Sequence, residues 1–262
     1  QYLSEPPTEW VRYEPKGKLL VLDRVYEKLG IQIPKSLIGR SVIQMPTMKT
    51  HIFTGTTGAM KNAFGGLLNL NRHWTHSVIH ETLVDLLRIQ KEIHPGLFAV
   101  MDGTIAGDGP GPRCMRPHVK NYILASDDFV AIDAIAAKMM GFDPMSDLKF
   151  IRLAHENGLG VGRPEEIEVV GEDVRGVNFG FRGSLDENTF ASWGQKLIYW
   201  GPLKPLENVL LRSPIVPWSY FASRAYHDGY WYPAHGKSRV RDIMKTSWGE
   251  LFKAYGDGRV LK

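Results

Sequence analysis

Short apolar runs alternate with helix-length segments along residues 19–171, and this alternation most constrains the fold. Apolar runs typical of strands occupy residues 19–22, 41–45, 97–101, 121–125 and 167–171. Helical periodicity, N-cap residues or terminal glycines mark residues 58–68, 77–93, 128–140 and 145–157. Strands that alternate with helices of this length predict an α/β fold with a mainly parallel sheet flanked by helices.

Composition divides the chain into two parts. The chain has 262 residues, 43% of them hydrophobic, which is enough to bury a sizeable core. Trp, Tyr and Pro become frequent after about residue 174. We therefore expect an α/β domain over residues 1–173 and an irregular, aromatic-rich C-terminal extension over residues 174–262. The extension packs on the α/β domain in the simplest interpretation, and contact with a partner or a membrane surface is the alternative.

Charge and cysteine content argue against several protein classes. The net charge is +4, but Lys and Arg are scattered and form no nucleic-acid recognition motif. No apolar run is long enough to be a transmembrane segment. With Cys114 as its single cysteine, this chain alone is expected to hold no iron–sulphur cluster. We predict a cytoplasmic location, with the reservation that a targeting signal could have preceded Gln1.

A candidate anion site lies between Lys49 and Asn62. Gly and Thr at residues 55–58 lead into a helix start, and either threonine next to Gly58 can serve as the N-cap. Lys61 follows in the first helical turn, where the helix dipole disfavours a cation. A Gly/Thr loop before a helix N-terminus, with a lysine on each side, is typical of an anion site. The spacing is not that of an ATP- or GTP-binding phosphate loop, and an ordinary capped turn is the alternative.

A second candidate region begins where the apolar run 97–101 ends. Asp102 stands at the carboxyl end of this predicted strand, where open α/β sheets bind ligands. Residues 106–112 contain too many glycines and prolines for a helix or strand, so Gly107, Asp108 and Gly109 are predicted to form a loop that can approach a ligand. A structural turn with a capping aspartate is the alternative.

Two further groups of side chains deserve a functional interpretation. Asp133 lies inside an apolar helix capped by Ser126 or Asp127, and a buried carboxylate there needs a partner. Asp128 lies about one turn away and can share its face, whereas exposure of Asp133 on a polar stripe is the alternative. His76 and His80 have the spacing of metal ligands on a helix, without an identified third ligand; capping or core histidines are the alternative.

Three segments together go beyond generic pattern: residues 46–65, residues 80–103 and residues 107–141. In this order and spacing they resemble a widespread prokaryotic family, domain of unknown function 362, whose members are often labelled iron–sulphur centre proteins. The resemblance covers about residues 42–170 and implies that the chain starts partway into the domain. The ferredoxin-like cysteine module of some members is missing here, and Ala106 stands where many members have Glu. Lys49, His51, Gly58 and Lys61 are also distantly similar to nickel-dependent lactate racemases, an analogy that assigns neither nickel nor racemisation.

These observations predict an enzyme that binds a small anionic substrate or cofactor and carries out redox or isomerase-type chemistry. Whether it also uses a divalent metal is left open. We expect the anion to be held by Lys49, Lys61, Asn62 and the backbone N–H groups of Thr57 and Gly58, opposite Gly107, Asp108 and Gly109. His51 and His80 are expected to act with Lys61 as acid/base groups or metal ligands, while Asp102, Asp128 and Asp133 orient or ligate. The rival hypothesis is a non-catalytic accessory subunit whose aromatic extension docks on a protein partner.

Overall fold

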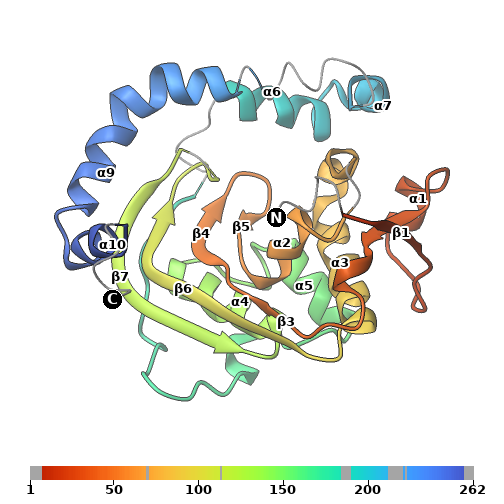
Figure 1. Ribbon diagram of the computed structural model, residues 1–262, viewed down its shortest axis with the longest axis horizontal. Helices are drawn as coiled ribbons and strands as arrows, with labels where there is room; N and C mark the ends of the chain where they lie inside the picture. The colour runs from red at the N-terminus through yellow and green to blue at the C-terminus, as the bar shows by residue number, and fades with distance from the viewer. Residues whose placement is uncertain are drawn as a thin grey trace.

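The sheet is built around its longest described strand, β6 (Leu97–Asp108). Along one edge β6 pairs in parallel with β3 (Val42–Gln44) and then with β4 (Thr47–His51). Along the other edge it pairs antiparallel with β7 (Arg116–Ser126), and β5 (Gly55–Thr56) extends antiparallel from β4. The predicted α/β class is confirmed in this computed structural model, which describes residues 8–68, 71–112, 114–183, 190–211, 221 and 223–256 (Figure 1).

Helices cover the sheet and form the core with it. The central one is α4 (Phe129–Met140), which buries every residue except Lys138 and ends at Gly141, whose φ of 108° suits a glycine. α4 contacts β6, β7, α2 (Ala59–Asn62) and α5 (Lys149–Glu156), and α5 packs on α3 (Ile79–Ile93). The short 3-10 helices η2 (Ala63–Gly65) and η3 (Arg72–Val78) complete the predicted helical segments 58–68 and 77–93.

The N-terminal part forms a small separate sheet in which β1 (Trp10–Tyr13) pairs antiparallel with β2 (Ile31–Pro34). In the sequence, α1 (Leu22–Val25) lies between these two strands and η1 (Lys35–Leu37) follows the second. The prediction of a strand at residues 19–22 is wrong. The buried carboxylate of Asp85 accepts hydrogen bonds from the N–H groups of Leu20, Val21 and Leu22, so these amides do not join a ladder.

The strand predicted at residues 167–171 is also absent. η4 (Pro164–Glu166) precedes this segment, and its residues pair with no strand in the described part of the chain. Val170 is 89% exposed, so the apolar residues of this segment are not buried as a strand of the core would be.

The C-terminal extension is more regular than expected, because its described residues are largely helical. It contains α6 (Phe190–Tyr199), η5 (Lys204–Leu206), α7 (Glu207–Leu211), the π-helix η6 (His227–Gly236), α9 (Lys237–Ile243) and α10 (Ser247–Gly256). These helices form an arc along the top and left of the sheet (Figure 1). Residues 184–189, 212–220, 222 and 257–262 of the extension lie outside the described residues. None of the described helices is both long and apolar enough to cross a membrane.

The extension is joined to the α/β body by specific contacts. The indole N–H of Trp200 donates to the carbonyl of Ser77, and that of Trp248 donates to the side chain of Asn121. Val174 and Phe181, which follow the compositional boundary, belong to the main hydrophobic core.

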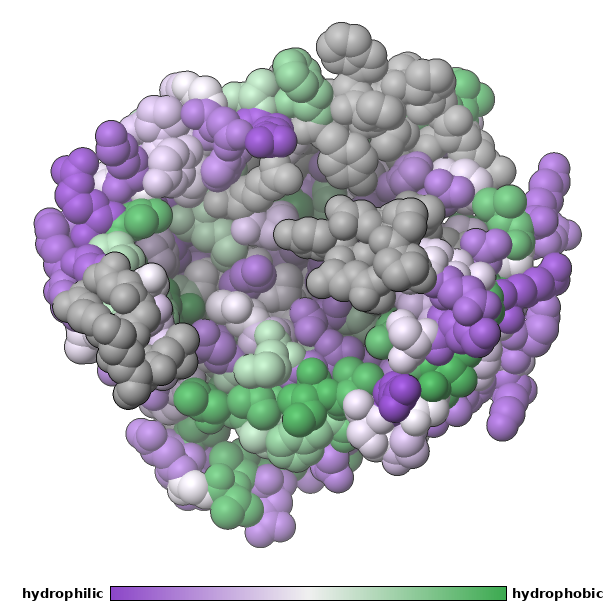
Figure 2. All heavy atoms as spheres, viewed as in Figure 1, coloured by the Kyte–Doolittle hydropathy of each residue, from purple (hydrophilic) through white to green (hydrophobic). Residues whose placement is uncertain are grey.

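Part of the sheet remains uncovered. Ile43 on β3, Phe98 on β6 and Ile123 on β7 are 64%, 41% and 66% exposed. Ile43 and Phe98 are partners in the parallel ladder. Figure 2 shows a hydrophobic band on the side of the molecule where these strands lie, below a more hydrophilic centre.

Candidate functional site

Four side chains that can carry positive charge converge on one side of β4: Lys49, His51, Lys61 and His76, which we call the cation cluster. Side chains alternate along β4, so Met48 and Thr50 are buried beneath it while Lys49 and His51 share the opposite face. α2 supplies Lys61 and η3 supplies His76. Ring contacts link three of these groups: Phe53 contacts His51 and His76, and Phe64 contacts His76 and Lys61. Besides burial, the charges of Lys61, His76, Lys49 and the neighbouring His80 all lower the pKa of His51.

The two lysines of the cation cluster have no counter-ion within the described part of the chain. Burial lowers the pKa of Lys49. Burial, and then the charge of Lys49, lower the pKa of Lys61 to about 8. The ammonium group of Lys61 lies 5.4 Å from the centre of the Phe64 ring, a contact that only partly replaces an anion. Two desolvated ammonium groups without a carboxylate form an environment that favours an anionic ligand.

The two histidines of the cluster are neutral and have opposite tautomers. His51 Nδ1 lies 3.1 Å from both the Phe53 N–H and the Thr54 hydroxyl, and acceptance from Phe53 corresponds to the tautomer with its proton on Nε2. His76 Nδ1 lies 3.1 Å from the carbonyl oxygen of His73, so its proton is on Nδ1 and Nε2 is an acceptor. Burial holds the pKa of His51 well below its ordinary value, and the charge of Lys61 adds to this effect. Burial also lowers the pKa of His76 to about 4.

Aromatic rings enclose one side of the cluster. The Phe53 ring lies edge-on to His51, His76, Tyr199 and Trp200, with ring centres 5.5 to 5.9 Å apart. The His76 and Tyr199 rings are stacked 5.7 Å apart at 12°. α6 of the extension therefore contributes to the wall of the cluster, which no local sequence pattern indicated.

The helix N-terminus predicted to bind an external anion is occupied by Asp133. The Asp133 carboxylate accepts from the N–H groups of Ala59 at 2.7 Å and Met60 at 3.1 Å. A Cβ atom at Gly58 would lie 2.0 Å from the Asp133 carboxylate, so only glycine allows this approach. The threonine N-cap prediction is wrong, because the N–H of Thr57 instead donates to the Lys49 carbonyl.

The other predicted aspartates also accept hydrogen bonds from backbone groups. Asp128, rather than Ser126 or Asp127, is the N-cap of α4, and its carboxylate accepts from the N–H groups of Val130, Ala131 and Val161. Asp102 is exposed and accepts from the N–H and hydroxyl of Thr104.

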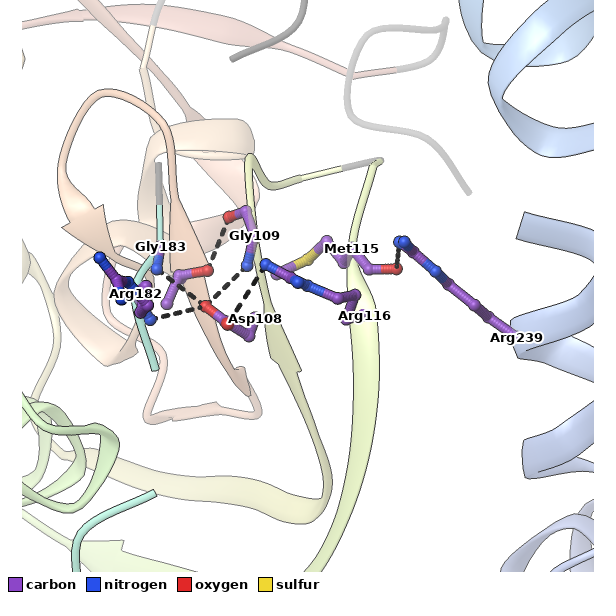
Figure 3. Close-up of polar contacts among 8 residues, drawn as sticks. Asp108, Gly109, Met115, Arg116, Arg182, Gly183 and Arg239 are labelled. Atoms are coloured by element: carbon purple, nitrogen blue, oxygen red, sulfur yellow. Dashed lines mark hydrogen bonds and ion pairs between the residues drawn. The ribbon is translucent and has the colours of Figure 1, made fainter. Parts of the chain in front are cut away.

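Asp108 fastens the start of the extension to the sheet. Its Oδ1 accepts from the N–H groups of Gly109, Arg182 and Gly183, and Arg116 lies 3.9 Å from its other oxygen (Figure 3). Ala106, Gly107 and Asp108 are in β6, so the prediction of a loop over these residues is wrong. Strand pairing explains the difference, because Gly107 pairs with Lys49 on one side and Pro117 on the other.

Asn62 and His80 lie at the edges of the cluster. The Asn62 amide donates to Gln44, whose own amide donates to the buried Gln90, so Asn62 is part of an internal polar chain. Burial lowers the pKa of His80 to about 4, and its buried Nδ1 has no hydrogen-bond partner. Across the described ranges, no three His, Cys, Asp or Glu side chains are grouped so as to hold a metal ion.

Comparison with known proteins shows that this region is similar to a known family. Residues 25–138 match the family described as domain of unknown function (DUF362). This part of the chain is similar to that family. The whole cation cluster lies inside the DUF362 segment, whereas Tyr199 and Trp200 lie outside it. The resemblance found in the sequence is thus confirmed.

One curated relative is the thylakoid-associated protein of Synechocystis sp., with 30% identity over 110 residues. The match covers 39% of this chain and 33% of that protein, so the chain spans about a third of the relative's length. No solved structure matches the chain.

Proposed function

We propose that the DUF362 segment binds a small carboxylate or phosphate at the cation cluster and that Lys61 transfers a proton there. The supporting observation is the pair of desolvated lysines, Lys49 and Lys61, that lack a counter-ion among the described residues. An anion between them would remove the repulsion that lowers the pKa of Lys61 and would replace water lost by burial.

The protonation states of the cluster suit isomerase-type chemistry. With a pKa of about 8 in the empty site, Lys61 is mostly an ammonium group near neutral pH, and a bound anion raises that pKa further. Lys61 therefore holds a proton that it can donate to the bound ligand. The Nε2–H of His51 can donate to a developing negative charge, and the bare Nε2 of His76 can accept a hydrogen bond. Donation of the Lys61 proton to a bound carboxylate or phosphate oxygen, and its return to the amine, would use only these groups. A divalent metal or a redox partner remains a prediction.

Isothermal titration calorimetry with sodium phosphate and sodium acetate at low ionic strength tests the binding proposal. We expect both anions to bind and expect Lys49→Met and Lys61→Met to weaken binding at least about tenfold, the effect of losing one charge-assisted contact of about 1.5–3 kcal/mol. Lys35→Met is the matched control, because Lys35 is exposed and pairs with Glu9. Equal affinities in all four proteins, or no binding to the wild type, would reject the proposal.

The second candidate is an accessory subunit that docks through the extension. Trp193, Phe221 and Tyr255 of the extension are 56%, 63% and 49% exposed, so several large aromatic rings contact solvent. Light scattering coupled to size exclusion, on wild type and a Trp193→Ala/Tyr255→Ala variant, tests this role. Association lost in the variant supports docking, and a monomeric wild type opposes self-association. A cytoplasmic location is part of the proposal and is tested by cell fractionation.

A further inference from the structure

A cavity of about 300 Å³ lies between the sheet and the C-terminal extension. Lys49, Gly107 and Met115 line it on the sheet side, and Trp231, Tyr232 and Arg239 line it on the extension side. Lys49 also belongs to the cation cluster, so the cavity adjoins the proposed anion site. Its volume is at the lower end of that of pockets for small organic molecules.

The extension side of the cavity is lined in part by Trp231, which is 9% exposed. His227, Trp231, Gly236 and Val240 all line the cavity and recur every four or five residues, the interval expected for one face of a π-helix. A Cβ atom at Gly236 would lie 2.7 Å from the Trp231 ring, so glycine lets the ring pack against the helix backbone.

Contacts on both sides hold the Trp231 side chain in place. The His227 ring stacks on Trp231 with ring centres 5.3 Å apart. The Arg239 guanidinium lies 5.5 Å from the Trp231 ring and donates to the Met115 carbonyl at 3.2 Å, which ties α9 to the sheet (Figure 3). The indole is therefore positioned before a ligand enters, which reduces the entropy lost on binding.

The charges around the cavity select an anion. Its lining contains the cationic side chains of Lys49 and Arg239 but no Asp or Glu. His227 also lines the cavity, and its Nδ1 lies 2.7 Å from a carboxylate oxygen of Asp228. Neither Lys49 nor Arg239 forms an ion pair with any residue that the structure describes. Away from these groups the surface is provided by apolar atoms of Ile105, Met115 and Trp231.

We propose that this cavity binds the aromatic part of the ligand whose anionic group lies at Lys49, so that the ligand class is an aryl carboxylate or aryl phosphate. This inference rests on the proposed anion site and extends it. The ring packs between Met115 and Trp231, and the charged group reaches the cation cluster past Lys49.

Matched probe pairs test the inference by calorimetry: sodium phosphate against phenyl phosphate, and sodium acetate against benzoate. The phenyl ring is expected to raise affinity at least about tenfold, since it removes apolar surface from water. Trp231→Ala is expected to abolish this advantage, and Val240→Trp to abolish it by filling the cavity. Both variants should bind phosphate like the wild type, which also shows that they are folded.

The outcomes separate the two proposals. If neither phosphate nor acetate binds and Lys49→Met does not affect any probe, the anion site itself fails. If the small anions bind through Lys49 but the phenyl ring adds no affinity, the aryl inference is overturned and the anion site stands. An advantage of the ring that persists in both Trp231→Ala and Val240→Trp also overturns it.

Discussion

Replacing Asp133 with asparagine should change how the stability of the protein depends on pH. Asp133 is 1% exposed and caps α2. Burial raises the pKa of its carboxyl group from 3.8 to about 7, more than the two N–H donors lower it. Between about pH 3.8 and pH 7, the Asp133 carboxyl group therefore keeps its proton in the folded state but has lost it in the unfolded state. Stability from this group is greatest at low pH and is lost as the pH rises toward 7.

The magnitude follows from the shift of the pKa. A change of about 3 units corresponds to roughly 4 kcal/mol, at 1.36 kcal/mol for each unit. Asparagine has nearly the same shape and does not titrate. The free energy of unfolding of the wild type, minus that of Asp133→Asn, should therefore fall by roughly 1–1.4 kcal/mol for each pH unit between about 5 and 7. Contributions from all other titrating groups cancel in this difference.

Urea unfolding from pH 5 to 8, followed by circular dichroism, measures this difference. Asp143→Asn is the control, because hydrogen bonds from Ser146 and Met145 lower the pKa of the exposed Asp143. The stability that Asp143 contributes is lost only as the pH falls below the ordinary pKa of an aspartate, 3.8. The difference in unfolding free energy between the wild type and Asp143→Asn should therefore not change between pH 5 and 8. A flat difference for Asp133→Asn as well would refute a raised pKa at Asp133.

The contact of Gly58 with Asp133 and the two lysines of the cation cluster lead to three other predictions. Gly58→Ala should destabilise the protein by about 2 kcal/mol or more, because its Cβ would overlap the Asp133 carboxylate; an unchanged urea midpoint would contradict this. Removing the nearby charge by Lys49→Met should raise the pKa of Lys61 above its value of about 8, as measured by NMR of the labelled amine; a fall would show that another group controls it. Phosphate affinity should decline as the pH rises through about 8, since Lys61 then loses its charge, and a pH-independent affinity would count against its role.

Local patterns predicted the framework of the fold well. The apolar alternation identified the sheet region that became β3, β6 and β7, and the helix predicted over residues 128–140 matches α4 and ends at Gly141 as expected. Its N-cap is Asp128 and not the predicted Ser126 or Asp127. The failures involve distant partners. The amides of residues 20–22 are bound by Asp85, more than 60 residues away, and no short sequence window contains that contact.

The candidate site shows the same division. Lys49, His51 and Lys61 could be grouped from sequence, because a strand followed by a turn and a helix brings them to one side. Which groups bind the carboxylates could not be predicted, since the amide donors for Asp133 come from a different helix. The role of Tyr199 was also inaccessible, because its contact with His76 depends on where the extension folds back.

The compositional boundary near residue 174 does not mark a place where the chain can be cut. The N–H groups of Phe179 and Phe181 donate to the carbonyls of Met139 and Met140 at the end of α4, and Lys138 donates to the Val174 carbonyl. A chain truncated at residue 173 would leave these helix-end carbonyls without partners and would open the core where Val174 and Phe181 pack. A shortened protein that keeps the DUF362 segment should therefore extend at least through Gly183, whose N–H is bound by Asp108.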